Sequence, residues 1–354
     1  MEIIKKNSYK EYEEFVKNHE NGNFMQSLKW TQVKYNWQYE CIVSKNAQGE
    51  IIGSMLVLIR KMPLGKTLLY SPRGPVCDYN DYDTISDLLS GVKVLAKQYK
   101  GYIFKMDPAV LEGDDAFVKA MEKLGFIHTP KMKDFETLQC RKNYMLNIEG
   151  KTLEEISMNF HQKWRYNIKV ATKKGVECKV CDKRYLDDFY ELMKITGVRD
   201  SFIIRPKDYF ERMMDALGEE HCKLFLCYRE GKALSGAITT QYAGKTCYVY
   251  GASDNEQRNF MPNHLMQWTM IQWAVENNGT WYDFQGIPHY EDENDPHYGV
   301  YRFKKGFNGE VIVFAGEFDY IFNPTYKKLI DMAEKTLKFY KKIYKKLFTR
   351  NRDK

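Results

Sequence analysis

Two adjacent lysines, Lys304 and Lys305, lie in the stretch of the chain best suited to chemistry, residues 298–324. Phe303 and Phe307 flank the pair. We expect a loop and a glycine-containing turn to carry the lysines, followed by a β-strand rich in valine and isoleucine. A lysine held between aromatic rings in a partly dry site stabilises a developing oxyanion more strongly than a lysine in water. The alternative is a solvated basic turn before an ordinary strand, and the residues alone leave both open.

Asp107 is the best placed carboxylate outside that stretch. It follows a predicted strand, residues 102–106, and precedes Pro108, which stops the strand. A carboxylate at the C-terminal end of a strand can orient a substrate or take part in proton transfer. It can also serve only as a cap of the turn, and this alternative stays open.

A second group of candidates combines cations with tyrosines. Lys34 is expected in a short amphipathic helix, beside its apolar face. Arg205 precedes Tyr209 by four residues, a spacing that places two side chains on one face of a helix. Tyr248 and Tyr250 alternate on a predicted strand, so both should point to one side of the sheet. We predict that these side chains line a ligand cleft; the alternative is that the tyrosines are amphipathic edges of the core.

Two predicted helices bear directly on the candidate residues. One spans residues 26–37 and contains Lys34. The other spans residues 152–174 and ends at Gly175, which suits a C-terminal cap. Its basic face can contact nucleic-acid phosphates through electrostatics, or can be an ordinary solvated face. The cations of this face are Arg165, Lys169, Lys173 and Lys174.

The elements that position these residues occur in two similar passes along the chain. Apolar alternation, helical periodicity and turn residues predict an α/β (α+β) fold with mixed sheets flanked by helices. Residues 49–58 resemble residues 231–240, and residues 102–107 resemble residues 281–286, at an offset close to 180 residues. Such a repeat indicates a duplicated domain, with a ligand cleft between the two copies. We assign residues 1–145 to the first domain, 146–317 to the second and 318–354 to a C-terminal return to the first.

Composition narrows the class of protein. Of the 354 residues 15% are aromatic, including 26 tyrosines, which argues against disorder and suits the binding of extended, partly polar ligands. No apolar run reaches the ~18 residues of a membrane span, and the N-terminus lacks the apolar core of a signal peptide, so we expect a cytoplasmic protein. The eight cysteines include a single CxxC pair and the seven histidines show no paired spacing, so we predict no metal.

The net charge of +7 is concentrated in the C-terminal tail. Residues 325–354 carry a net charge of +8, which leaves about −1 for the rest of the chain. Apolar residues recur in this tail at steps of three or four, with lysines between them, which predicts a basic amphipathic helix. Such a helix can contact an anionic membrane or RNA, or can be a docked terminal helix with a soluble back.

Four segments, taken together and in order, resemble the FemABX family. Members of this family are tRNA-dependent aminoacyl transferases that build the interpeptide bridge of bacterial peptidoglycan. The resemblance covers nearly the whole chain and implies two tandem GNAT-like domains, that is, domains like those of acyl-CoA N-acyltransferases. The segments are residues 164–176, residues 250–253 with 258–268, residues 282–287 and residues 298–324.

The resemblance implies two substrates and no cofactor. The family moves an amino acid from aminoacyl-tRNA to an amine on the stem peptide of a peptidoglycan precursor. This sequence has no charged heptad insertion of the kind that forms the coiled-coil arm of some members, so it is more similar to the short, arm-less branch that modifies UDP-MurNAc-pentapeptide. That favours the soluble precursor over lipid II, whereas the basic tail favours a lipid-linked precursor and peripheral contact with the inner face of the membrane. We expect a monomer.

The resemblance also implies roles for the candidate residues. Lys304 matches the family's motif lysine beside Phe303 and is expected to act on the oxyanion and on the tRNA 3′ end, with Lys305 as the alternative. Asp107 matches an acidic position of the family. Two cations match positions that contact the diphosphate of the precursor, which an arginine can bind bidentately; these are Lys34 and Arg205. The expected substrate-lining tyrosines are Tyr209, Tyr248 and Tyr250, and the expected tRNA contacts are Lys305, Arg165, Lys169 and Lys173.

Two other functions stay open at this point. Acyl-CoA-dependent N-acyltransferases hold the pyrophosphate of coenzyme A with a glycine-rich loop that opens a helix. The equivalent residues, 255–264, contain no glycine, which disfavours a coenzyme A donor. The other alternative is a non-catalytic protein that binds RNA or a membrane surface through the basic tail. The transferred amino acid is also open, since discrimination among glycine, alanine and serine rests on one methyl or hydroxyl group.

Overall fold

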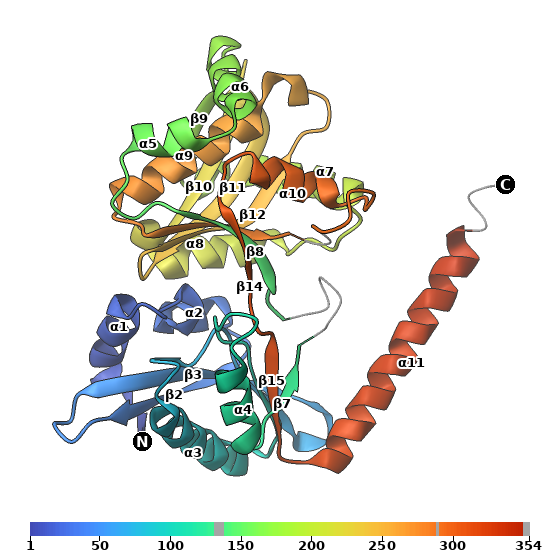
Figure 1. The fold of residues 1–354 in the computed structure, drawn as a ribbon. Coiled ribbons are helices and arrows are strands. Elements are labelled where there is room, and N and C mark those ends of the chain that lie inside the picture. The colour runs from blue at the N-terminus through green and yellow to red at the C-terminus, as the bar shows by residue number, and fades with distance from the viewer. Residues whose placement is uncertain (131–137, 288–289, 350–354) are drawn as a thin grey trace.

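The computed structural model of the chain describes residues 1–130, 138–287 and 290–349. Within them the chain forms two mixed β-sheets, each covered by helices (Figure 1). The predicted mixed α/β class is therefore confirmed.

The first sheet has the strand order β1-β2-β3-β4-β6-β15-β7, and β5 pairs with β3. β4 and β6 run parallel, and the other neighbours run antiparallel. An uninterrupted run of small and apolar residues buries β3 on both faces from Gly53 to Ile59. The strands are β1 Glu2–Ile4, β2 Gln38–Lys45, β3 Ile51–Lys61, β4 Thr67–Ser71, β5 Val76–Cys77, β6 Gly101–Met106, β7 Ile127–Thr129 and β15 Glu317–Ile321.

The second sheet repeats this plan in the order β14-β8-β13-β12-β11-β10-β9. Its one parallel pair is β12 with β13. In both sheets a run of antiparallel strands leads through one long helix to a parallel partner, so the repeated element order is confirmed. The strands are β8 Lys142–Asn147, β9 Glu177–Cys181, β10 Cys222–Arg229, β11 Lys232–Tyr242, β12 Lys245–Ser253, β13 Trp281–Gly286 and β14 Glu310–Val313.

The two sheets exchange one strand each. β8 follows the first sheet in sequence but inserts between β13 and β14 of the second sheet. β15 does the reverse and inserts between β6 and β7 of the first sheet. The chain therefore crosses to the second sheet at residue 142 and returns at residue 317, and a domain boundary at residue 145 falls inside β8.

Helices cover both sheets and connect their strands (Figure 1). The long helices α3 and α9 lie in equivalent places, each leading to the parallel partner strand of its sheet. The helices are α1 Tyr9–Asn18, α2 Leu28–Val33, α3 Tyr82–Tyr99, α4 Asp115–Lys123, α5 Leu153–Asn159, α6 Gln162–Lys173, α7 Leu186–Arg199, α8 Lys207–His221, α9 Pro262–Glu276, α10 Tyr298–Lys305 and α11 Pro324–Thr349.

The loop predicted to carry the lysine pair is a helix. Residues 298–305 form α10, so Lys304 and Lys305 lie in its last turn. The turn after Gly306 and the strand β14 follow as predicted. Two glycines next to aromatic residues favour a loop from sequence, but packing of α10 against the second sheet overrides that local preference.

Two predicted helices are shorter than expected. The helix predicted over residues 26–37 shrinks to α2, because the Ser27 side chain caps its start and Lys34 is already its C-terminal cap. The helix predicted over residues 152–174 is two helices, α5 and α6, separated by extended backbone at Phe160. Gly175, at a φ of +75°, follows the end of α6 as predicted.

One apolar core crosses from the first half of the chain to the second. Trp30 and Val33 of α2 belong to the same buried cluster as Phe210 and Met213 of α8. Because residues of both halves share this cluster, the halves form one packed body rather than two independently moving domains.

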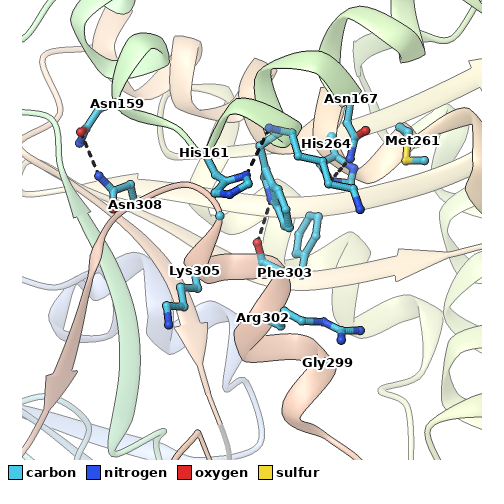
Figure 2. A pocket seen from close by; sticks show the side chains of 13 residues that line it. Asn159, His161, Asn167, Met261, His264, Gly299, Arg302, Phe303, Lys305 and Asn308 are labelled. Carbon is cyan, nitrogen blue, oxygen red and sulfur yellow. Dashed lines mark hydrogen bonds between the residues drawn. The ribbon is translucent and has the colours of Figure 1, made fainter. Parts of the chain in front are cut away.

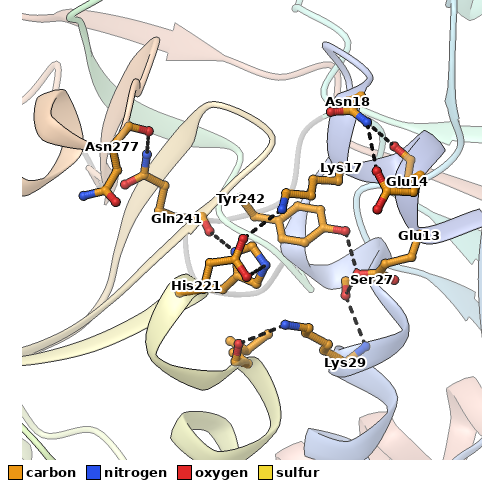
Figure 3. Close-up of polar contacts among 12 residues, drawn as sticks. Glu13, Glu14, Lys17, Asn18, Ser27, Lys29, His221, Gln241, Tyr242 and Asn277 are labelled. Atoms are coloured by element: carbon orange, nitrogen blue, oxygen red, sulfur yellow. Dashed lines mark hydrogen bonds and ion pairs between the residues drawn. The ribbon is translucent and has the colours of Figure 1, made fainter. Parts of the chain in front are cut away.

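Polar contacts frame this shared core (Figure 3). The Glu13 carboxylate on α1 accepts hydrogen bonds from Ser27 Oγ at 2.5 Å and from the Tyr242 hydroxyl of β11 at 2.7 Å. Nearby, Lys17 forms an ion pair with Glu220 at 2.8 Å. These contacts fix α1 and the start of α2 against the second half.

The C-terminal helix α11 leaves the first sheet and projects away from the body (Figure 1). Its first turn is docked, since Tyr326 packs on Tyr102 with ring centroids 4.9 Å apart. Further along, Leu329, Met332 and Leu337 are exposed. In the part of the chain that the structure describes, no helix is long and apolar enough to cross a membrane. Residues 350–354, the end of the predicted return, lie outside the described residues.

Candidate functional site

Lys34, Arg205, Tyr209 and Tyr250 meet where α2 faces the start of α8. The Lys34 ammonium lies 5.7 Å from the Tyr209 ring centroid, and the Arg205 guanidinium lies 5.4 Å from the same ring. The Tyr250 hydroxyl donates a hydrogen bond to the Tyr209 hydroxyl at 3.2 Å. The structure thus brings together four of the five residues predicted to bind the acceptor; we refer to these four as the cation–tyrosine cluster.

The cation–tyrosine cluster carries uncompensated positive charge. Among the described residues, no carboxylate forms an ion pair with Lys34 or Arg205. Burial is the main cause that lowers the pKa of Lys34 to about 8, and the neighbouring charge of Arg205 contributes to that shift. Two neighbouring cations without a counter-ion can bind an anion with several oxygens, such as a diphosphate.

Tyr248 does not join the cluster, and the prediction that it shares a side of the sheet with Tyr250 is wrong. In the pairing of β11 with β12, Ile238 opposes Tyr250 and the next residue, Thr239, opposes Tyr248, so Val249 is an extra residue in a β-bulge. The extra residue reverses the alternation. Tyr248 therefore packs into the core of the second sheet, whereas Tyr250 packs on the shared core.

Asp107 lies at the end of β6, buried in a network of donors. Its carboxylate accepts hydrogen bonds from the Tyr70 hydroxyl at 2.8 Å and from the backbone N–H of Arg73 at 2.7 Å. Burial raises the pKa of Asp107 to about 6, and the positive charge of Arg73 opposes that rise. The carboxylate is thus mostly ionised at neutral pH, which is close to its pKa. This suits a group that orients a substrate or accepts a proton.

Arg73 is a site residue that the sequence did not single out. It is buried, and its guanidinium donates to the Asp107 carbonyl at 3.3 Å and to the Cys140 carbonyl at 2.6 Å. Its backbone adopts a φ of +55°, which is uncommon for a side chain larger than that of glycine. Nothing in the local pattern marks Arg73, because its partners are 34 and 67 residues away.

Lys304 of α10 is also buried, beside the end of β13. Its ammonium donates hydrogen bonds to the carbonyl oxygens of Gln285 at 3.1 Å and Gly286 at 2.7 Å. Burial lowers the pKa of Lys304 to about 8. Burial raises the pKa of Asp283, and its hydrogen bonds and the charges of both Arg73 and Lys304 oppose that rise. Arg73 therefore connects the Asp107 network to the surroundings of Lys304.

A pocket of about 960 Å³ opens on the other side of α10 (Figure 2). Its cations are Lys163, Arg302 and Lys305, and no acidic side chain lines it. Trp164, His264 and Phe303 form an aromatic wall, with ring centroids 5.3 Å apart between Trp164 and His264 and 5.1 Å apart between His264 and Phe303. The lining residues are Asn159, His161, Lys163, Trp164, Asn167, Met261, His264, Gly299, Arg302, Phe303, Lys305, Gly306 and Asn308.

The geometry of this pocket suits flat rings and anions together. The Trp164 indole N–H donates to the Phe303 carbonyl at 3.0 Å, which holds the aromatic wall against α10. Burial lowers the pKa of His264 to about 4, so its ring is neutral near pH 7. Neutral aromatic faces beside lysine and arginine are the usual combination in sites for single-stranded nucleic acid.

The predicted tRNA contacts separate into three environments. Lys305 lines the pocket, whereas Lys304 does not. Arg165 donates hydrogen bonds to the carbonyls of Met158 at 2.6 Å and Phe160 at 2.7 Å, so it mainly holds the junction between α5 and α6. Lys169 and Lys173 are exposed on α6, outside the pocket.

Comparison with solved structures defines the class of fold. A tandem GNAT protein from the clavulanic acid biosynthesis pathway superimposes with a TM-score of 0.53 at 8% identity, covering 90% of this chain and 96% of that one. At that identity the likeness concerns the fold alone, and it confirms the tandem GNAT-like architecture.

The sequence comparison gives the family. A sequence model of the FemAB family matches residues 8–242 and 228–335, and the chain belongs to this family. It is 32% identical to a lipid II:glycine glycyltransferase of Staphylococcus aureus, over 92% of this chain and 94% of that protein. A crystal structure of FemX superimposes with a TM-score of 0.85 at 32% identity, covering 93% of this chain and all of that one. The alignment to the S. aureus protein spans 403 positions, more than this chain has, so that protein carries residues absent here.

We expect the affinity of the cation–tyrosine cluster for inorganic pyrophosphate to fall as the pH rises through about 8. Lys34 is charged below its pKa of about 8 and neutral above it, so the fall should approach roughly tenfold, the contribution of one charged hydrogen bond. Titration calorimetry across this pH range measures it. Lys34→Arg is the matched control, because a guanidinium stays charged; an equal fall in the variant would contradict the assignment.

We expect Arg73→Met to raise the pKa of Asp107 above its value of about 6, because the variant removes the nearest positive charge. Tyr70, Tyr79 and Glu317 also face this carboxylate and are left in place. Carbon NMR of the aspartate carboxyls, with Asp107→Asn to assign the signal, gives the value. Arg73→Lys keeps a positive charge and should leave the pKa of Asp107 close to its original value. An unchanged or lower pKa in Arg73→Met would refute the electrostatic link.

Proposed function

We propose that this chain is an aminoacyltransferase that moves an amino acid from aminoacyl-tRNA to the stem-peptide amine of a peptidoglycan precursor, a step of interpeptide bridge synthesis. The observation that carries this proposal is the 32% identity, over 92% of the chain, to proteins named lipid II:glycine glycyltransferase. The acceptor is UDP-MurNAc-pentapeptide or lipid II. The geometry of the two cationic sites supports the same reaction.

The cation–tyrosine cluster is proposed to hold the diphosphate of the acceptor. Arg205 offers a planar fork of donors and Lys34 offers a point charge, and together they match adjacent phosphates. The Tyr209 ring lies against both cations and limits their orientations. Tyr250 in turn fixes the Tyr209 hydroxyl.

The pocket beside α10 is proposed to take the 3′ end of the tRNA. Trp164 and Phe303 offer faces on which bases or the terminal ribose can pack. Lys163, Arg302 and Lys305 offer charge to the phosphates, and the exposed Lys169 and Lys173 extend the positive surface along α6. Such binding is electrostatic and should weaken with added salt.

The transfer itself needs an amine that loses a proton and an oxyanion that is stabilised. The amine attacks the ester carbonyl of the aminoacyl-tRNA, and the ribose oxygen leaves with a proton. Lys304 is proposed to stabilise the oxyanion: its ammonium has three donors, and backbone carbonyls accept two of them. Asp107 is proposed to orient the acceptor amine or take its proton, with its charge maintained by Arg73.

The basic helix α11 is proposed to give peripheral contact with the inner face of an anionic membrane. Leu329, Met332 and Leu337 are exposed on it, and residues 325–354 carry a net charge of +8. Such a combination binds at the interface through apolar contact and attraction to anionic headgroups. We propose that the protein acts there as a cytoplasmic monomer.

The decisive experiment is a transfer assay. Purified protein is mixed with UDP-MurNAc-pentapeptide or with lipid II in micelles, and with glycyl-, alanyl- or seryl-tRNA, and the acceptor mass is measured. We expect the mass to increase by one amino-acid residue with at least one donor. An acceptor that stays unchanged with all donors would rule out the reaction, and labelling from acetyl-CoA instead would favour an acyl-CoA-dependent enzyme.

Variants at the two sites should affect different kinetic constants. We expect Lys304→Met to lower kcat by roughly 10²–10³, as loss of an oxyanion donor does, with little change in the KM for the acceptor. Arg205→Ala should raise that KM by roughly tenfold through loss of a charged hydrogen bond, with a smaller change in kcat. Thermal melts control for folding, and equal effects on both constants in both variants would refute the division of roles.

A further inference from the structure

The end of α7 and the turn that follows it expose apolar side chains, and we call residues 198–203 the apolar loop. Ile203 is 99% exposed, Val198 83% and Phe202 45%. Soluble proteins rarely gather large apolar side chains at such exposure in one short segment. The segment therefore calls for a partner that can cover it.

The exposure is built into the backbone and is not a frayed end. The Asp200 N–H donates to the Thr196 carbonyl at 2.9 Å, and the Phe202 N–H donates to the Gly197 carbonyl at 3.1 Å, so both bonds fold the loop back on α7. Ile204 turns inward onto the shared core, against Gly197. The preceding side chain, Ile203, points the other way, into solvent.

The apolar loop borders the cation–tyrosine cluster. Ile203 precedes Arg205 by two residues, and Arg205 lies over the Tyr209 ring. On the α2 side, Tyr35 follows Lys34 directly, is 67% exposed and stacks under Arg212 at 4.5 Å. Apolar and amphipathic side chains thus lie next to both cations that are proposed to bind a diphosphate.

We propose that the apolar loop docks on the membrane surface from which a lipid-linked acceptor is drawn, so that Lys34 and Arg205 reach its diphosphate at the headgroup level. This inference rests on the proposed function and selects the lipid-linked acceptor over the nucleotide-linked one. A lipid diphosphate has its tail in the bilayer and its phosphates at the surface. A protein that grips those phosphates must bring its neighbouring side chains into the interface, where isoleucine, phenylalanine and tyrosine are favoured.

Charge distribution separates this contact from the one proposed for α11. Around the loop, Arg199 pairs with Asp200, Lys194 with Glu191 and Lys207 with Asp187. The contact therefore depends on apolar insertion and on the acceptor's own phosphates, and not on anionic lipids. Helix α11, in contrast, should require anionic lipids and low salt.

The test compares two acceptors that carry the same stem peptide. One is lipid-linked in phosphatidylcholine vesicles at high salt, which suppresses any contribution of α11, and the other is UDP-linked in solution. We expect Phe202→Ser/Ile203→Ser to lower kcat/KM on the vesicle acceptor by about tenfold or more and to leave kcat/KM on the soluble acceptor unchanged. The matched control is Ile127→Ser/Val180→Ser, which removes two apolar side chains of 53% and 52% exposure from other sites and should change neither value.

Equal activity of the loop variant and the wild type on vesicles, or an equal loss on both acceptors, would overturn the inference. If the wild type transfers to neither acceptor, the proposed function fails and vesicle co-sedimentation still decides. The wild type should sediment with phosphatidylcholine vesicles carrying the lipid-linked acceptor, and the loop variant should not; equal sedimentation overturns the inference. The inference would also be overturned if light scattering showed that the wild type is a dimer and the loop variant a monomer, because a second copy would then cover the loop.

Discussion

The packing of α2 on α8 is the contact on which the rest of the molecule depends. α2 has six residues, far too few to be stable alone, so its helical form and its direction come from Trp30 and Val33 buried against the second half. Full burial of such side chains contributes about 1.5–3 kcal/mol each. This packing ends at Lys34, and it places a lysine of the first half beside Arg205 and Tyr209 of the second.

The exchange of β8 and β15 has a related consequence for two buried charged residues, Asp107 and Lys304. Each half receives a strand from the other, so β6, which leads to Asp107, and β13, which carries the carbonyls bonded to Lys304, both lie beside an exchanged strand. Burying isolated charges is costly unless they are paired or hydrogen-bonded. Here the carbonyls of Gln285 and Gly286 accept hydrogen bonds from the Lys304 ammonium. The Asp107 carboxylate accepts a hydrogen bond from the backbone N–H of Arg73. Burial lowers the pKa of Lys304 and raises that of Asp107, and the charge and backbone N–H of Arg73 oppose the rise at Asp107.

Local sequence patterns predicted what local forces decide. The strands, the repeat, the cap at Gly175 and the pairing of Arg205 with Tyr209 follow from alternation, periodicity and turn chemistry. Arg205 nevertheless precedes the helix, so the i to i+4 argument gave the right neighbours although Arg205 is not itself helical. Tyr248 was misplaced because one extra residue in a strand leaves the hydrophobic pattern almost unchanged; only Gly251, where a Cβ would lie 1.6 Å from the Tyr248 hydroxyl, marks the distortion.

Non-local features were beyond such patterns. Arg73 acquires its partners from segments far along the chain. The pocket joins three helices, because α9 begins about 100 residues after α6 and α10 begins about 140 residues after α6. Trp164 and His264 belong to stretches that carried the family resemblance, yet nothing in either stretch shows that their rings face each other. Residue type indicated a site, and only the fold assembled it.

Adjacent residues of α10 contact two different parts of the structure, and this matters for the mechanism under the proposed function. Lys304 donates to the carbonyls of Gln285 and Gly286, whereas its neighbours Phe303 and Lys305 line the pocket. The end of α10 thus separates the pocket from the surroundings of Lys304. The Trp164 ring packs directly on Gly306, where a Cβ would lie 2.1 Å from it. A side chain at this position would push the aromatic wall away from the helix that carries both lysines.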